Sequence, residues 1–109
     1  MIIDFKNMEE TASENFKGGE GVLYRKGHHD DMGKIIWLRI PQGSSIGYHT
    51  HETDCEVMYI VSGRARCIDD GEERELKAGD VHYCPQGHSH CMMNPDEEDL
   101  VIFGVLPEN

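Results

Sequence analysis

The stretch "YHTHETDCEVMYIVSG" (residues 48–63) places two histidines and a glutamate at the start of an apolar, β-branched segment. On an extended strand, residues i and i+2 share a face, so His49 and His51 can point at one position while Ile46 points to the opposite face. Glu56 opens the next strand, and its carboxylate reaches the same position if the short segment between them bends. Imidazoles and a carboxylate suit Zn²⁺, Fe²⁺, Mn²⁺, Ni²⁺ or Cu²⁺. Alone, the pattern is ambiguous, because the chain has 7 histidines and 21 acidic residues.

Short β-type segments and turn signals alternate on both sides of this stretch. Strands are predicted at residues 22–26, 34–40, 46–51, 56–63, 64–68, 73–76, 81–84, 89–94 and 99–106. Turns are predicted between them, including an Asp-Gly hairpin at 70–71 and a polar turn over 27–33. No long segment has a period of 3.6 residues. The pattern predicts an all-β sandwich or barrel.

The length of 109 residues fits one domain. We expect an irregular N-terminal arm over 1–21, with a helical turn near 8–16, followed by a β-barrel domain over 22–109. The formal net charge of −11 argues against binding to nucleic acid or to an anionic membrane surface.

The N-terminal residues lack the basic and apolar regions of a signal peptide, and no apolar run is long enough to span a membrane. The expected location is therefore cytoplasmic. Cys55, Cys67, Cys84 and Cys91 form no C-x-x-C pair, and we expect reduced thiols without a catalytic role.

A second motif follows in "GDVHYCPQGHSHCMMN" (residues 79–94). Together the two motifs resemble those of the cupin superfamily, which fixes the spacing of a Gly, His-x-His, Glu and Gly, and then of a Gly, Pro-x-Gly, His and Asn. The matching residues are Gly43, His49, His51, Glu56 and Gly63 in the first motif and Gly79, Pro85, Gly87, His90 and Asn94 in the second. The resemblance implies a single-domain jelly-roll β-barrel.

The resemblance also implies that His49, His51, Glu56 and His90 are the ligands of a divalent transition metal (Fe, Mn, Zn or Ni). With three imidazoles and one carboxylate, an octahedral ion keeps two open positions for water, dioxygen or a bidentate oxygen ligand. Iron or manganese fits slightly better than zinc, which prefers four ligands.

The sequence leaves the function open between two classes. One is a metal-dependent enzyme for a small oxygen-bearing metabolite, acting as a dioxygenase, decarboxylase, isomerase or lyase. The other is a non-enzymatic module that binds a metal or a metabolite. His88 is equally compatible with a pocket-lining residue and an exposed one. Because the strands at 57–61 and 100–106 are apolar on both faces, we also expect a homodimer formed by sheet packing.

Overall fold

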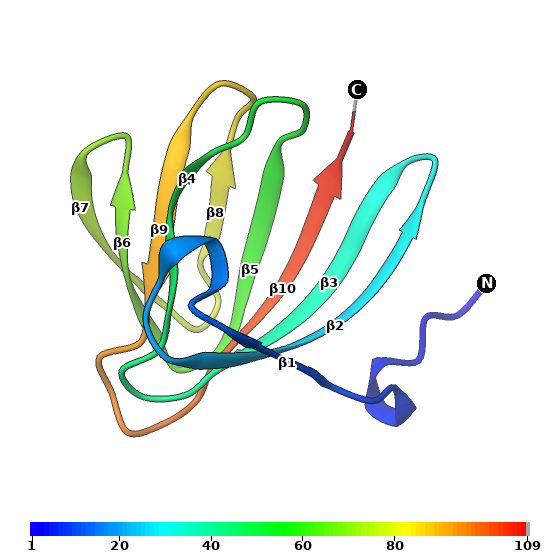
Figure 1. Cartoon of the computed structure of the whole chain (residues 1–109), viewed down its shortest axis with the longest axis horizontal. Helices are drawn as coiled ribbons and strands as arrows, with labels where there is room; N and C mark the ends of the chain where they lie inside the picture. The colour runs from blue at the N-terminus through cyan, green and yellow to red at the C-terminus, as the bar shows by residue number, and fades with distance from the viewer. Residues whose placement is uncertain (109) are drawn as a thin grey trace.

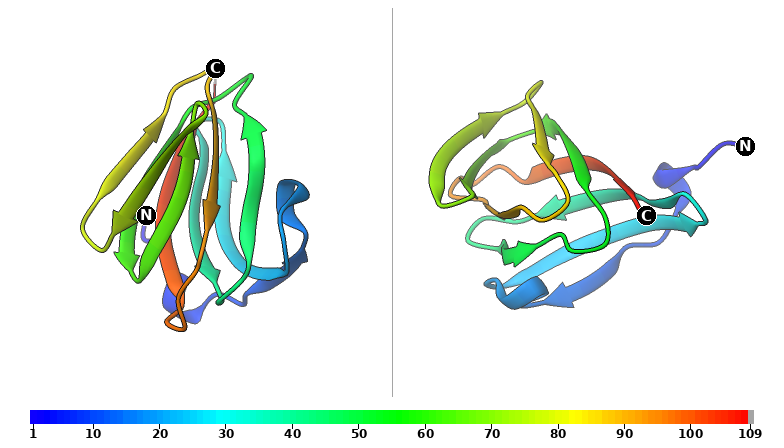
Figure 2. Two further views of the ribbon diagram at one scale, coloured as in Figure 1. Left: turned by 90° about the vertical axis from the view of Figure 1, so that its left-hand side faces the viewer. Right: turned by 90° about the horizontal axis from the view of Figure 1, so that it is seen from above.

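The computed structural model describes residues 1–108 and consists of two antiparallel β-sheets that face each other (Figure 1). The strands are β1 (Thr11–Glu14), β2 (Val22–Asp30), β3 (Gly33–Ile40), β4 (Ser45–Thr50), β5 (Glu56–Ser62), β6 (Arg64–Asp69), β7 (Glu72–Lys77), β8 (Val81–Cys84), β9 (Ser89–Met93) and β10 (Leu100–Pro107). One sheet has the order β1-β2-β3-β10-β5-β8 and the other has the order β4-β9-β6-β7. The two layers are visible edge-on in Figure 2. The all-β prediction is therefore confirmed.

The strands agree with the sequence pattern except near the N-terminus. The helical turn expected near residues 8–16 is wrong, because residues 11–14 form β1 and pair with β2. Two 3-10 turns flank that strand, η1 (Phe5–Asn7) and η2 (Phe16–Gly18). The turn expected over residues 27–33 is also too long, since β2 continues to Asp30 and pairs with β3. No helix among residues 1–108 is long and apolar enough to cross a membrane.

The hydrophobic core lies between the two sheets. Strand β5 alternates strictly between buried and exposed residues, so that Met58 and Ile60 enter the core while the residues between them face outward. Cys67 and Met92 enter from the opposite sheet and are fully buried. The glycine of the Asp-Gly hairpin, Gly71, has a φ of +85°, as a two-residue turn of this type requires.

The N-terminal segment is attached to the outer face of the larger sheet. Phe5 packs on Trp37 and Phe103, with ring centroids 5.9 and 6.4 Å away. Arg39 of β3 donates hydrogen bonds to both carboxylate oxygens of Glu10, at 3.0 and 2.9 Å. These contacts hold residues 5–14 against β2 and β3.

Candidate metal centre

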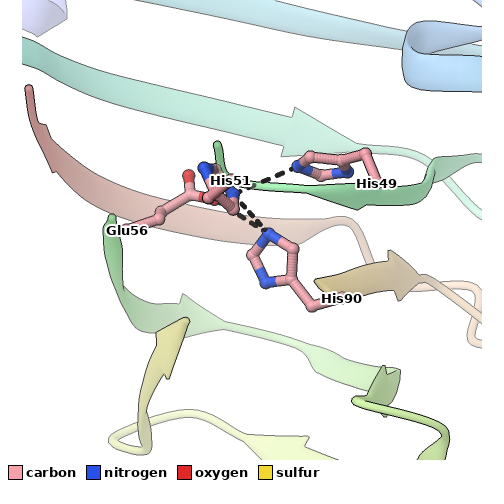
Figure 3. A group of neighbouring side chains, drawn as sticks. All are labelled: His49, His51, Glu56 and His90. Carbon is pink, nitrogen blue, oxygen red and sulfur yellow. Dashed lines mark hydrogen bonds and ion pairs between the residues drawn. The ribbon is translucent and has the colours of Figure 1, made fainter. Parts of the chain in front are cut away.

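Four side chains converge inside the barrel, and they are the four that the sequence motifs select (Figure 3). His49 lies on β4, His51 directly follows it, Glu56 is the first residue of β5 and His90 lies on β9. The ligand atoms of these residues all lie within 4.8 Å of one another. His51, Glu56 and His90 are buried, whereas His49 is half-buried. The cluster is able to hold a metal ion.

A β-bulge in β4 turns His49 toward this point. The register of β4 against β9 shifts between Ile46 and His49, so both of these side chains face the interior. The expectation that Ile46 points away from the histidines is therefore wrong. The bulge includes Gly47, where an added Cβ would lie 2.1 Å from the carbonyl oxygen of Lys17 in η2. Only glycine permits this close packing of η2 on β4.

Hydrogen bonds to the outer ring nitrogens orient two of the histidines. His49 Nδ1 lies 2.7 Å from the carbonyl oxygen of Gly47, and His51 Nδ1 lies 2.7 Å from Asp54 Oδ1. Both oxygens can only accept, so each Nδ1 carries the proton and donates it. In the neutral rings, each Nε2 then presents a lone pair to the centre of the cluster. Such outer partners fix the tautomer and the orientation of metal-binding histidines.

The inner atoms of the cluster are all electron-pair donors at short range. The Nε2 atoms of His49 and His51 are 3.2 Å apart, and those of His51 and His90 are 2.9 Å apart. Glu56 Oε1 lies 3.2 Å from His51 Nε2 and 3.1 Å from His90 Nε2. Two ligands at right angles, each about 2.1 Å from one ion, lie about 3.0 Å apart. The donor set and its spacing therefore fit one divalent cation, which would balance the facing lone pairs.

The electrostatics of the site keep Glu56 ionised. Burial alone would raise the pKa of this carboxyl, but its contacts with His51 and His90, whose protonated rings favour a carboxylate, lower it to about 2. The hydrogen bond to Glu56 raises the pKa of His51, whereas burial lowers the pKa of His49. The site thus carries a negative charge that a cation can neutralise. A proton on His51 Nε2 would compete with that cation for the lone pair of the ring.

His82 is a further partner of the cluster, which the two sequence motifs do not include. Its side chain is buried on β8, and its Nε2 lies 3.0 Å from His90 Nδ1. Burial lowers the pKa of His82, which keeps the ring neutral and able to accept a hydrogen bond. Accepting from His90 leaves the lone pair of His90 Nε2 facing the cluster. The alternation of "VHYC", which places His82 with buried Cys84 on one face, was the available signal.

The cysteines and His88 lie outside the cluster. All four cysteines are free thiols, and Cys67, Cys84 and Cys91 are buried. Burial raises the pKa of Cys67 and of Cys84 to about 12, so these thiols stay protonated and unreactive. His88 is half exposed and contacts Asp70, with Nδ1 to Oδ2 at 2.5 Å. His88 is thus an exposed residue and not a lining residue of the site.

A cavity of about 610 Å³ opens beside the cluster. Its wall includes His49, His51 and Glu56, and is completed by residues of β2, β3, η2 and the loop after β4. This volume lies in the range of pockets that hold small organic molecules. A ligand in the cavity would have direct access to the inner atoms of the cluster.

Two facing antiparallel sheets and a largely buried group of three histidines and one glutamate define the chain as a β-barrel protein with a cluster that is able to hold a metal ion. The model of the cupin domain matches residues 36–106, and the chain belongs to the cupin family. The resemblance seen in the two sequence motifs is thereby confirmed.

One named relative from Thermotoga maritima and two solved structures resemble all or nearly all of the chain. The oxalate-binding protein of Thermotoga maritima is 30% identical over 112 residues, which cover 97% of this chain and 93% of that protein. The crystal structure of a predicted oxalate decarboxylase from Thermotoga maritima has a TM-score of 0.94 at 28% identity, covering 100% of both chains. KdgF from Halomonas sp. has a TM-score of 0.82 at 21% identity, covering 100% of this chain and 96% of that one, and shares the fold.

Proposed function

We propose that the protein binds a divalent transition metal through His49, His51, Glu56 and His90 and holds a small carboxylate ligand of the oxalate class on that metal. The observation that carries this proposal is the convergence of four electron-pair donors within 4.8 Å of one another. Four of their separations are 2.9–3.2 Å, and no proton lies between His49 and His51 when both rings are neutral. When bound, the metal would act as a Lewis acid with open positions for oxygen ligands.

The ligand class follows from charge and from the relatives. Three neutral imidazoles and one carboxylate leave a divalent ion with a net charge of about +1, which favours an anionic oxygen ligand. A relative that covers nearly the full chain is named an oxalate-binding protein. A bidentate carboxylate would use both open positions of an octahedral ion.

The test is elemental analysis of protein purified without an affinity tag or added metal, followed by calorimetric titration with oxalate. We expect about one transition-metal ion per chain, and oxalate binding only to the metal-loaded form. Glu56→Gln and His51→Ala should lose the metal, whereas the control His88→Ala, outside the cluster, should keep it. Undiminished metal in both cluster variants would refute the assigned site.

A second candidate function is catalysis on the bound carboxylate. The observation that favours it is Glu52, an exposed carboxylate in the cavity wall that the cluster does not use and that can exchange protons with a ligand. Incubation of the metal-loaded protein with oxalate, with and without dioxygen, would separate the two functions. Formate and carbon dioxide in equal amounts would establish a decarboxylase, in which the carbon–carbon bond breaks and a proton replaces carbon dioxide. Unchanged oxalate after many hours would establish a binding module.

We also propose that the protein is a homodimer formed through the outer face of the larger sheet. Val57, Tyr59 and Val61 of β5 alternate outward, and Val81 and Tyr83 of β8 continue the same exposed apolar surface. Such a surface at a sheet edge favours association. Light scattering after size-exclusion chromatography at micromolar concentration should give twice the mass of one chain for the wild type. The Tyr59→Glu variant should give the mass of a single chain. A monomeric wild type would contradict the proposal.

The proposed location is the cytoplasm. The four free thiols support it, because reduced cysteines are typical of that compartment. Fractionation of cells that produce the protein would test this location, and recovery outside the cytoplasmic fraction would contradict it.

A further inference from the structure

The cavity beside the metal cluster gathers basic side chains without acidic partners. The lysines and arginine in its wall are Lys17, Arg25, Lys26 and Lys34, four of the ten in the chain. Within residues 1–108, no carboxylate lies within 4.0 Å of any of these four cations, although the chain has 21 acidic residues. Outside the cavity, four basic residues do have such partners: Arg39, Arg64, Arg74 and Lys77. The cavity wall thus carries four cations against the three carboxylates of Glu52, Asp54 and Glu56, in a protein that is acidic overall.

Arg25 has the most defined position among these cations. It lies on β2, and its Nε donates a hydrogen bond of 3.0 Å to Ser13 Oγ on the neighbouring strand β1. Its guanidinium carbon lies 4.8 Å from the ring centroid of Phe16, which supports the plane of the group. These two contacts involve Nε and one face of the guanidinium group. The two terminal nitrogens of the group can therefore bind a ligand, and their fork geometry matches the two oxygens of an anionic group.

The other cations are less suited to this role. Lys26 donates from Nζ to the carbonyl oxygen of Phe5, at 2.7 Å on the outer side of β2. Lys34 is exposed at the start of β3, where it pairs with Leu106 of β10. Arg25 thus offers the positioned anion receptor, with Lys17 of η2 beside it over the same ring of Phe16.

The position of Arg25 relates it to the metal cluster through packed elements. Phe16 belongs to η2, which packs on β4 at Gly47, and the carbonyl oxygen of Gly47 orients His49. Arg25 and the cluster therefore border one cavity, and the contact between η2 and Gly47 of β4 connects their positions. A cavity of about 610 Å³ also has room for a ligand much larger than oxalate.

We propose that Arg25 binds a second anionic group of the ligand, a carboxylate or a phosphate, while the first carboxylate lies at the metal cluster. The natural ligand is then an organic acid with two anionic groups joined by several atoms, and oxalate occupies only the metal end. This inference rests on the proposed metal and carboxylate binding.

The test is calorimetric titration of the metal-loaded protein with oxalate, with the diacids malonate to adipate, and with the monoamide of each diacid. 4-Phosphonobutyrate, a phosphonate counterpart of glutarate, distinguishes a phosphate from a carboxylate at the second position. We expect at least one longer diacid to bind more tightly than its monoamide, or the phosphonate to bind more tightly than the monoamide of glutarate. This difference in affinity should disappear in Arg25→Gln. The variant should weaken binding of that ligand by roughly 10- to 100-fold and leave oxalate within about threefold.

Two further variants distinguish binding by the paired guanidinium nitrogens of Arg25 from a general effect of positive charge. Arg25→Lys keeps the charge but loses the paired nitrogens, and we expect an intermediate loss of roughly 3- to 10-fold. Arg66→Gln removes the same charge from β6, outside the cavity, and should leave every ligand unaffected. Thermal unfolding of each variant confirms that it is folded.

The outcomes distinguish this inference from the proposed function. If oxalate binds but Arg25→Gln changes no ligand, or weakens all of them by one factor, the receptor role of Arg25 is refuted and the metal site stands. If neither oxalate nor any diacid binds the metal-loaded protein, both proposals fail. A loss restricted to the second anionic group, in Arg25→Gln and not in Arg66→Gln, supports the inference.

Discussion

Replacement of His82 by leucine should weaken metal binding although His82 is not one of the four proposed ligands. In the structure, His82 Nε2 lies 3.0 Å from His90 Nδ1, and both rings are buried. Leucine fills similar space but cannot accept the hydrogen bond. His90 would then lose the contact that holds its proton on Nδ1 and its lone pair on Nε2.

The size of the effect follows from this one contact. A neutral hydrogen bond contributes about 0.5–1.5 kcal/mol, and a buried donor left without a partner costs about 1–3 kcal/mol. Outer partners of metal-binding histidines affect metal affinity by about 10- to 100-fold, which corresponds to about 1.4–2.8 kcal/mol. We therefore expect His82→Leu to raise the dissociation constant for Zn²⁺ or Mn²⁺ by about 10- to 100-fold.

The assay is a competition titration against a chromophoric chelator at fixed pH and salt. His82→Gln is the matched variant, because its amide oxygen can accept from His90, and it should stay within about threefold of the wild type. The absorption spectrum of the Co²⁺-loaded protein gives a second measure, since a reoriented His90 would change the ligand field in the leucine variant alone. An affinity for His82→Leu within twofold of the wild type, or equal losses in both variants, would refute the reasoning.

Three further predictions concern protons, a buried amide and the close packing of η2. Because Glu56 raises the pKa of His51, metal binding should release a proton from His51. Metal affinity should then rise with pH by up to about tenfold per pH unit below that pKa and level off above it. Calorimetry in buffers of different ionisation enthalpy measures the number of protons released, and a pH-independent affinity would contradict the prediction. Asn94→Ala removes two hydrogen bonds donated to backbone carbonyls and one accepted from a backbone N–H, and should lower the free energy of unfolding in urea by about 2–5 kcal/mol; a loss below 1 kcal/mol would count against it. Gly47→Ala should lower the free energy of unfolding by about 3 kcal/mol, because the added methyl group overlaps with η2. The control Gly43→Ala should lower it by about 1 kcal/mol, since φ is +79° there and the space is open. Equal losses in urea unfolding would show that the close packing is not what requires glycine.

The sequence predicted that the four side chains of the cluster lie together, partly from strand geometry and partly from the resemblance to the cupin motifs. His49 and His51 share a face by the two-residue repeat. The resemblance to the cupin motifs implies that Glu56 and His90 join them, and the structure brings the ligand atoms of all four within 4.8 Å of one another. Gly87, in the Pro-x-Gly turn of the second motif, has a φ of +86°, a backbone conformation that favours glycine. The shared face of His49 and His51 follows from a local rule that needs no knowledge of the partner strands.

The partners that the sequence did not predict depend on pairing between distant strands. His82 reaches His90 because β8 and β9 enter different sheets that face each other, which no local pattern encodes. The bulge that turns Ile46 inward depends on how β4 pairs with β9. The short strand β1 exists because β2 offers it an edge, since residues 11–14 have a polar composition that favours no strand alone. The domain boundary placed before residue 22 remains a prediction.

The position of β10 has a consequence for the way the molecule is made. Residues 100–107 leave the ribosome after all the other strands, yet β10 lies between β3 and β5 in the larger sheet. Until it inserts, β3 and β5 each have an unpaired edge, and β5, which carries Glu56, is paired only with β8. Closure of the barrel must therefore wait until synthesis of β10 is complete, and the non-local pairing that it requires is slow. If the protein binds a metal at the cluster, it would therefore do so late in folding. A nascent chain that stops before residue 100 would expose two unpaired strand edges that can pair with other chains.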